Sequence, residues 1–147
     1  MLKLVRLHLA LPAMLMALGL WLGSTGARAS APSEPLQVLV FWGSWCSNCP
    51  ALMREMEALR KQYAGRNVEF IAVSLEGEAA PQQYLNRKGY GFGLKTDGDA
   101  LLAHYQAVGV PWVVVTDPSG RALANPSARS APQDVVEQVK LELDLRS

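Results

Sequence analysis

The sequence is poor in the side chains from which most metal sites are built. Its 147 residues include 2 cysteines and 2 histidines, and His104 is the only histidine outside the N-terminal segment. Structural zinc sites use four Cys or His ligands, so zinc is not expected. Charged residues make up 18% of the chain, the formal net charge is +1, and there is no run of basic residues. Nucleic acid is therefore not an expected partner.

The sequence also lacks an apolar run long enough for a typical membrane span. Residues 7–22 form an apolar run that a histidine and a proline interrupt, whereas a transmembrane helix needs about 20 apolar residues. Lys3 and Arg6 precede this run and Ala-Arg-Ala at 27–29 follows it, in the order of a secretory signal. We predict that residues 1–29 are a cleaved signal peptide, with a retained membrane anchor as the alternative. Either one places the rest of the chain outside the cytoplasm, in the periplasm, at a membrane or in the medium.

One domain is expected after this segment. Cleavage after residue 29 would remove three basic residues and no acid, so the formal net charge would change from +1 to −2. Residues 30–35, rich in Pro and Ser, are typical of a linker. Residues 36–147 show no internal repeat and no second boundary, and their number suits a single hydrophobic core.

The two cysteines lie where a predicted strand gives way to a predicted helix. Residues 37–41 are a short apolar run of β-forming residues. Residues 50–63 have apolar side chains at helical spacing. This arrangement puts Cys46 at the mouth of the helix and Cys49 in its first turn. The apolar stripe consists of Leu52, Met56, Leu59 and Tyr63. The side expected to face solvent consists of Arg54, Glu55, Glu57, Arg60 and Lys61.

The position of the cysteines predicts their chemistry. A thiol at a helix N-terminus lies near unpaired backbone N–H groups and the positive end of the helix dipole, so the pKa of Cys46 is expected below that of a free cysteine. Cys49 is expected to be better covered. A disulfide that closes so short a loop removes little entropy from the unfolded chain. A redox centre is therefore favoured over a structural bridge.

Residues 41–50 carry a Trp-Cys-x-x-Cys motif between strand and helix. This resembles the thioredoxin superfamily, in particular the TlpA/ResA/CcmG branch of extracytoplasmic thiol–disulfide oxidoreductases, over residues 36–125. The resemblance implies an α/β thioredoxin-like fold with a central mixed sheet flanked by helices. It also implies a catalytic pair that forms a Cys46–Cys49 disulfide, with Cys46 as the nucleophile and Cys49 as the resolving thiol. No cofactor and no metal are needed for this chemistry.

The resemblance also suggests a substrate site beside the cysteines. Val110-Pro111 stands where thioredoxin-like proteins carry a cis proline, and the Val110 backbone would pair with an extended substrate peptide. A trans proline that starts an edge strand is the alternative. Trp45 is expected to form a lip that contacts substrate, or else to be an ordinary half-buried tryptophan. Trp112 departs from the threonine that the family often has after the proline, and its bulk is expected to reshape the substrate groove.

The acid that many relatives use to assist the second cysteine is not at its expected places. Val40 stands six residues before Cys46, where thioredoxins have a buried aspartate, and Leu52 stands where the TlpA branch commonly has glutamate. Glu55 is expected on the solvated side, and Glu76 is another candidate. Ser47-Asn48 between the cysteines carries no charge and no histidine, which favours a reductant or isomerase over a strong oxidant.

Further elements follow the redox motif. We predict strands at 68–74, 112–116 and 121–124, helices at 81–88 and 100–106, a last helix that ends at about 145, and a type I turn at 117–120. Residues 130–133 match a capping box. The buried face of the last helix is expected to present Val136, Val139 and Leu143. No conformation is assigned to the glycine-rich stretch 90–94.

The function expected from this sequence is disulfide exchange with protein substrates. The partners would be protein thiols and disulfides, together with a redox partner protein that is either membrane-embedded or soluble. One alternative is a copper metallochaperone that uses Cys46, Cys49 and His104. Another is a binding module of the same fold with an idle disulfide. Membrane contact is expected only if residues 1–29 are retained.

Overall fold

The computed structural model describes residues 34–75, 79–126 and 130–146. These described residues form one compact unit. The predicted signal peptide and most of the predicted linker lie outside the described residues. Among the described residues, no helix has the length and apolar character needed to cross a bilayer.

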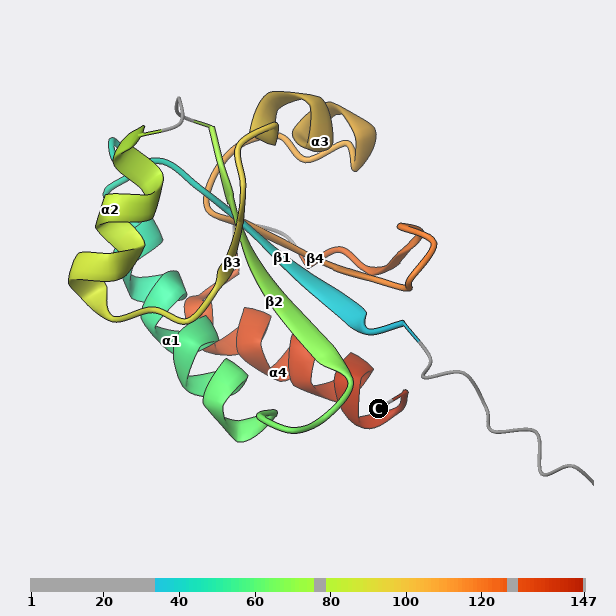
Figure 1. The fold of residues 1–147 in the computed structure, drawn as a ribbon. Helices are drawn as coiled ribbons and strands as arrows, with labels where there is room; N and C mark the ends of the chain where they lie inside the picture. The colour runs from blue at the N-terminus through green and yellow to red at the C-terminus, as the bar shows by residue number, and fades with distance from the viewer. Residues whose placement is uncertain (1–33, 76–78, 127–129, 147) are drawn as a thin grey trace, which may run out of the picture. The chain divides into compact units, whose positions relative to one another are not determined.

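The core of the unit is a mixed five-stranded sheet (Figure 1). Its strands are β1 (Leu36–Trp42), β2 (Val68–Ser74), β3 (Gly93–Lys95), β4 (Trp112–Thr116) and β5 (Ala122–Ala124), in the spatial order β3-β2-β1-β4-β5. β1, β2 and β3 are parallel, whereas β4 is antiparallel to β1 and to β5. The three longest strands match the apolar runs at 37–41, 68–74 and 112–116, so these predictions are confirmed.

Helices cover both faces of the sheet. α1 (Cys49–Gln62), α2 (Ala79–Lys88) and α4 (Pro132–Asp144) pack on one face, and α3 (Gly98–His104) lies on the other (Figure 1). The strands alternate between the two cores, as the two-residue period requires. Val38, Val40 and Trp42 face α1, while Leu39 and Phe41 face α3.

Strand register brings two distant segments of the chain to one edge of the sheet. In the antiparallel pair of β1 and β4, Phe41 is the partner of Trp112. Continued by one step, this register sets Pro111 opposite Trp42 at the carboxyl end of β1. The loop to α1, which carries Cys46, starts at the same point. The sheet therefore juxtaposes the proline and the cysteines before any side chain is considered.

α1 and α4 pack side by side, and a hydrogen bond ties them at the end remote from Cys46. Tyr63 Oη donates to the Asp144 carboxylate at 2.5 Å. Burial is the main cause that raises the pKa of Tyr63 to about 12, and the bond to Asp144 adds to it. The hydroxyl therefore remains a donor through the neutral range.

The sequence prediction was wrong about Glu57. It was assigned to the solvated side of α1, yet it is 4% exposed. Its carboxylate accepts two hydrogen bonds from Arg60, at 2.8 and 2.9 Å, and one from the Gly91 amide at 3.1 Å. The ion pair with Arg60 and the backbone N–H make this burial possible. Glu57 thereby fastens α1 to the segment that leads into β3.

Three local predictions also differ from the structure. The cap residue of α4 is Ala131, without a side-chain hydrogen bond, because the helix begins one residue later than the capping-box pattern assumes. The fully buried face of α4 presents Val135 with Val139 and Leu143, and Val136 is only partly buried. α3 begins at Gly98 and ends at His104, before the predicted 106. β3 fills part of the stretch 90–94 that was left unassigned.

We expect Glu57→Gln to destabilise the protein in a pH-dependent way. The bonds from Arg60 hold the pKa of the Glu57 carboxyl below its usual value, against the opposing effect of burial. A lowered folded-state pKa contributes stability that is present above the unfolded pKa, about 4.3, and is lost as the pH falls through the folded value. The free energy of unfolding should therefore drop by about 1–2 kcal/mol at pH 7, and by much less at pH 3.

Urea unfolding of the oxidised protein at both pH values measures this difference. Glu137→Gln, the same charge change at an exposed site on α4, is the matched control and should have little effect. Equal destabilisation by Glu57→Gln at pH 3 and pH 7 would show that the charge is not what stabilises the fold.

Candidate active site

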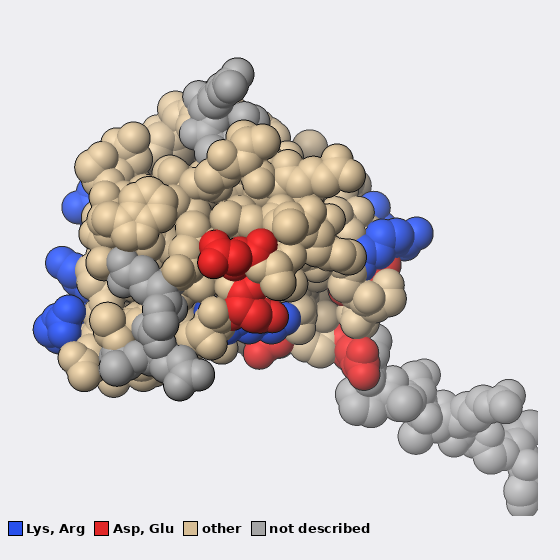
Figure 2. Space-filling model, turned by 90° about the horizontal axis from the view of Figure 1, so that it is seen from above, with Lys and Arg blue, Asp and Glu red and all other residues tan. Residues whose placement is uncertain are grey.

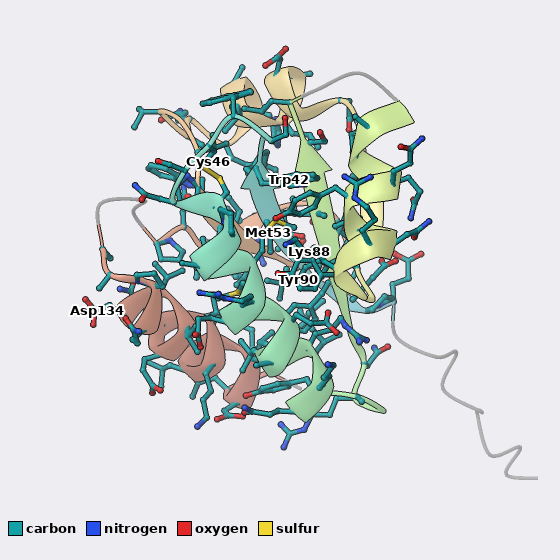
Figure 3. All side chains as sticks on the ribbon, turned by 90° about the vertical axis from the view of Figure 1, so that its left-hand side faces the viewer. Trp42, Cys46, Met53, Lys88, Tyr90 and Asp134 are labelled. Atoms are coloured by element: carbon teal, nitrogen blue, oxygen red, sulfur yellow. A yellow bond between two sulfur atoms is a disulfide. The ribbon has the colours of Figure 1, made fainter. Side chains whose placement is uncertain are left out.

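Cys46 and Cys49 form a disulfide at the N-terminal end of α1. The S–S distance is 2.09 Å and the two Cα atoms lie 5.4 Å apart. Figure 3 shows this bond in yellow where the loop from β1 enters the helix. The loop is closed by a hydrogen bond from the Cys46 amide to the Gly43 carbonyl at 3.1 Å. Both sulfurs therefore sit at the carboxyl edge of β1, the edge at which open α/β sheets usually bind ligands.

The two sulfurs differ in exposure and in surroundings. Cys46 is 7% exposed and Cys49 is 1% exposed. The Cys49 amide donates to Cys46 Sγ at 3.1 Å. The cap residue Asn48 makes no side-chain cap bond, and the first turn of α1 contains no acidic residue. The N–H groups and dipole of α1 are thus directed at Cys46 without a nearby carboxylate in that turn to offset them.

The Val110–Pro111 peptide bond is cis, as the resemblance implied. Val110 packs against the apolar cluster that contains both cysteines. Pro111 lines a groove of about 420 Å³ that it shares with the start of α1 and the start of α4. The other lining residues are Asn48, Ala51, Leu52, Ser130, Ala131, Pro132 and Val135. The groove lies beside the redox pair, and the sequence did not predict the part that α4 plays in it.

The three tryptophans near the site occupy different positions. Trp42 is buried and its ring lies 4.7 Å from that of Tyr84, so the prediction that it belongs to the core is confirmed. Trp45 is 66% exposed, more than a half-buried residue would be. Its ring lies over Gly43, where an added Cβ would come within 2.7 Å of Trp45 Nε1. Glycine at this position therefore lets the ring fold back against the loop.

Trp112 faces away from the groove. It is 8% exposed and packs with Val114 in the core under α3, while Val113 and Val115 face α1. The alternation of side chains along β4 fixes the direction in which Trp112 points, and this direction could have been predicted from the sequence. Any contact of Trp112 with a substrate would therefore be indirect, through the loop that precedes it.

Trp112 is held by a residue that the sequence prediction missed. Its indole N–H donates to the Asn125 side-chain oxygen, and Asn125 Nδ2 donates to the Tyr105 carbonyl at 3.1 Å. Asn125 follows β5, Tyr105 follows α3, and neither carries a local motif. In the sequence, only the tryptophan at position 112, where the family often has threonine, indicated that the segment after the cis proline differs from the family pattern.

The surroundings of Cys49 are apolar. Val40 and Leu52, the residues at the two family positions for an assisting acid, are buried in the cluster that contains Cys49. Glu55 is partly exposed on α1. Glu76 lies outside the described residues. In the described part of the site, water is therefore the proton acceptor that remains for Cys49.

His104 is not grouped with the cysteines. It is exposed at the end of α3, where its ring lies 4.6 Å from that of Tyr105. Across residues 34–75, 79–126 and 130–146, no three or more His, Cys, Asp or Glu side chains come together as a metal site would require. The copper alternative thus finds no support in this geometry.

Relatives of this chain include known thiol–disulfide exchange proteins. Residues 28–122 match the AhpC/TSA family. The thiol-disulfide oxidoreductase ResA of Bacillus thuringiensis (strain Al Hakam) is 29% identical over 108 residues, which are 72% of this chain and 58% of ResA. The chain therefore spans little more than half the length of this curated relative.

Solved structures share the fold at lower identity. StoA from Bacillus subtilis has a TM-score of 0.57 at 17% identity, over 73% of this chain and 84% of that one. A thiol:disulfide interchange protein of the thioredoxin family from Chlorobium tepidum has a TM-score of 0.61 at 19% identity, over 76% and 81%. Together with the ResA match, these likenesses confirm the resemblance seen in the sequence. The chain has a thioredoxin-like fold and belongs to the AhpC/TSA family.

Proposed function

We propose that this protein is a thiol–disulfide oxidoreductase that reduces disulfides in protein substrates outside the cytoplasm. One observation carries the proposal. The Cys46–Cys49 disulfide caps the N-terminus of α1, with the more exposed sulfur accepting a backbone hydrogen bond and an uncharged groove beside it. A merely structural bridge needs neither the exposure nor the groove.

The proposed reaction has two exchange steps. The Cys46 thiolate bonds to one sulfur of the substrate disulfide, the substrate S–S bond breaks, and the other substrate sulfur leaves as a thiolate that takes a proton from water. Cys49 then loses its proton to water and attacks Cys46 Sγ, and the second substrate sulfur leaves. The substrate gains two electrons and the Cys46–Cys49 disulfide forms. A dithiol partner protein would return two electrons and restore the reduced pair.

The rim of the site favours an uncharged, extended segment of the substrate. Residues 43–49 carry the disulfide, and neither they nor the residues that line the groove include Lys, Arg, Asp or Glu. The face seen in Figure 2 is mostly neither acidic nor basic. A group of acids lies nearer its centre with basic atoms beside it, and other Lys and Arg lie at its margins. A cis proline leaves the preceding backbone open to pair with an extended chain. Trp45 adds exposed apolar area at the rim.

Export is part of the proposal, and membrane contact is expected only if residues 1–29 are retained. The order of charge, apolar run and small residues in 1–29 supports a signal peptide, and the resemblance supports an extracytoplasmic site of action. The proposed reducing role, as opposed to an oxidising one, depends on the uncharged pair Ser47-Asn48 between the cysteines. The reduction potential of the Cys46–Cys49 pair, measured against glutathione, would test the reducing role separately from the exchange activity.

Cys49→Ser should trap substrates as stable mixed disulfides, because no second thiol remains to release them. Cys46→Ser should trap little, since the buried Cys49 would have to attack instead. Non-reducing gels of the reduced variants mixed with a disulfide-containing protein, followed by mass spectrometry, measure the trapping. Trapping by neither variant would favour the idle-disulfide alternative.

The reduced pair should be alkylated unequally. Cys46 is more exposed and faces the N–H groups of α1, so iodoacetamide should modify it several times faster than Cys49. It should also ionise below about pH 8.5, the value of a free thiol. Peptide mapping at short times and thiolate absorbance near 240 nm provide the two readouts. In urea the two cysteines should react at similar rates, and faster labelling of Cys49 in the folded protein would reverse the assigned roles.

Exchange with an uncharged peptide disulfide should depend little on salt. Because the rim segments lack charge, kcat/KM should change by less than about twofold between roughly 0.05 and 0.5 M NaCl. Stopped-flow tryptophan fluorescence can follow the reaction. A steep fall with salt would mean that charged groups elsewhere on the surface guide the substrate.

A further inference from the structure

A single side chain holds both ends of the loop that carries the cis proline. The loop, residues 106–111, connects α3 to β4. Asn125 Nδ2 donates to the Tyr105 carbonyl immediately before the loop, at 3.1 Å. Asn125 Oδ1 accepts from the indole N–H of Trp112 immediately after it. We call these two hydrogen bonds the Asn125 bridge.

The loop combines an uncommon backbone conformation with an exposed middle. Its first residue, Gln106, has φ +55° although it is not glycine, a conformation that L-residues rarely adopt. A Schellman motif holds this turn, with the Ala107 amide bonded to the Leu102 carbonyl at 2.9 Å. Val108 is 81% exposed, so part of the loop contributes little to either core. The contacts that Asn125 makes at both loop ends therefore add to the Schellman turn in holding the shape of the loop.

Asparagine suits both ends because its amide offers a donor and an acceptor. The Tyr105 carbonyl can only accept, and the Trp112 indole can only donate. Aspartate could serve Trp112 but not Tyr105, and an apolar residue could serve neither. The long tryptophan side chain reaches Asn125 from the position after the cis proline, where the family pattern has a short threonine. Trp112 and Asn125 thus act as a pair.

We propose that Asn125 is a positioning residue for disulfide exchange with extended polypeptides. Through the bridge it fixes residues 106–111, so that the Val110 backbone faces the substrate beside Cys46. This inference rests on the proposed function. It specifies, in addition, which substrates depend on the Asn125 bridge. A peptide that pairs with Val110 needs the loop, whereas a small disulfide needs only the sulfur of Cys46.

Asn125→Ala and Trp112→Phe test the bridge from its two sides. With insulin as the protein disulfide, each should lower kcat/KM by about threefold to tenfold, mainly by raising KM, as expected for the loss of one or two hydrogen bonds. With Ellman's reagent as the small disulfide, kcat/KM should stay within about twofold of the wild type, because Cys46 is untouched. Asn86→Ala, which removes an exposed side-chain bond to Gln82 on α2, is the matched control.

Two further measurements separate positioning from stability. The double variant should lose less than the product of the single losses, because both changes break the same hydrogen bond. Amide hydrogen exchange in residues 106–111 should speed up in Asn125→Ala while that of α1 stays unchanged. Asn125→Asp, which keeps only the acceptor, should behave more like Asn125→Ala than like the wild type.

Equal losses with insulin and Ellman's reagent, or no loss with insulin, would overturn the proposal. So would unchanged hydrogen exchange in the loop. If the wild type reacts with neither disulfide, the proposed function fails instead, and hydrogen exchange still decides whether Asn125 holds the loop.

Discussion

The antiparallel pairing of β1 with β4 is the constraint on which the site depends. β1 ends where the cysteine loop begins, and β4 begins where the cis proline ends. Because Phe41 pairs with Trp112, both transitions fall at one edge of the sheet. Had β4 been parallel to β1, Pro111 would lie at the opposite edge, away from the disulfide. Strand direction thus brings together two short segments that lie more than sixty residues apart in the chain.

The same edge supplies the chemical asymmetry of the disulfide. α1 starts at Cys49, so one sulfur lies inside the first turn and the other lies just before it. Burial of Cys49 among Val40 and Leu52 removes it from solvent, while Cys46 receives an N–H donor. The proposed order of attack and release follows from these positions and calls on no charged neighbour from the described part of the site.

Most of the architecture could be predicted because its signals are local. The apolar runs gave the three long strands, and the helical stripe of Leu52 and Met56 gave the buried face of α1. Features that depend on tertiary contacts were missed. Glu57 is buried only because Arg60 and the Gly91 amide meet it, and β3 is a three-residue strand that exists through its pairing with β2. The role of Asn125 arises only because the segment after β5 lies beside the residue that follows α3.

The Asn125 bridge contains an amide, an indole and a backbone carbonyl, none of which gains or loses a proton in the range where proteins work. Nearby, Tyr105 Oη donates to the Gly120 carbonyl, and burial raises the pKa of this phenol, so that contact also survives mild alkali. The two hydrogen bonds that hold the ends of residues 106–111 therefore do not depend on pH in that range. Under the proposed export, a change in the pH around the protein would alter the ionisation of the thiols without breaking these two bonds.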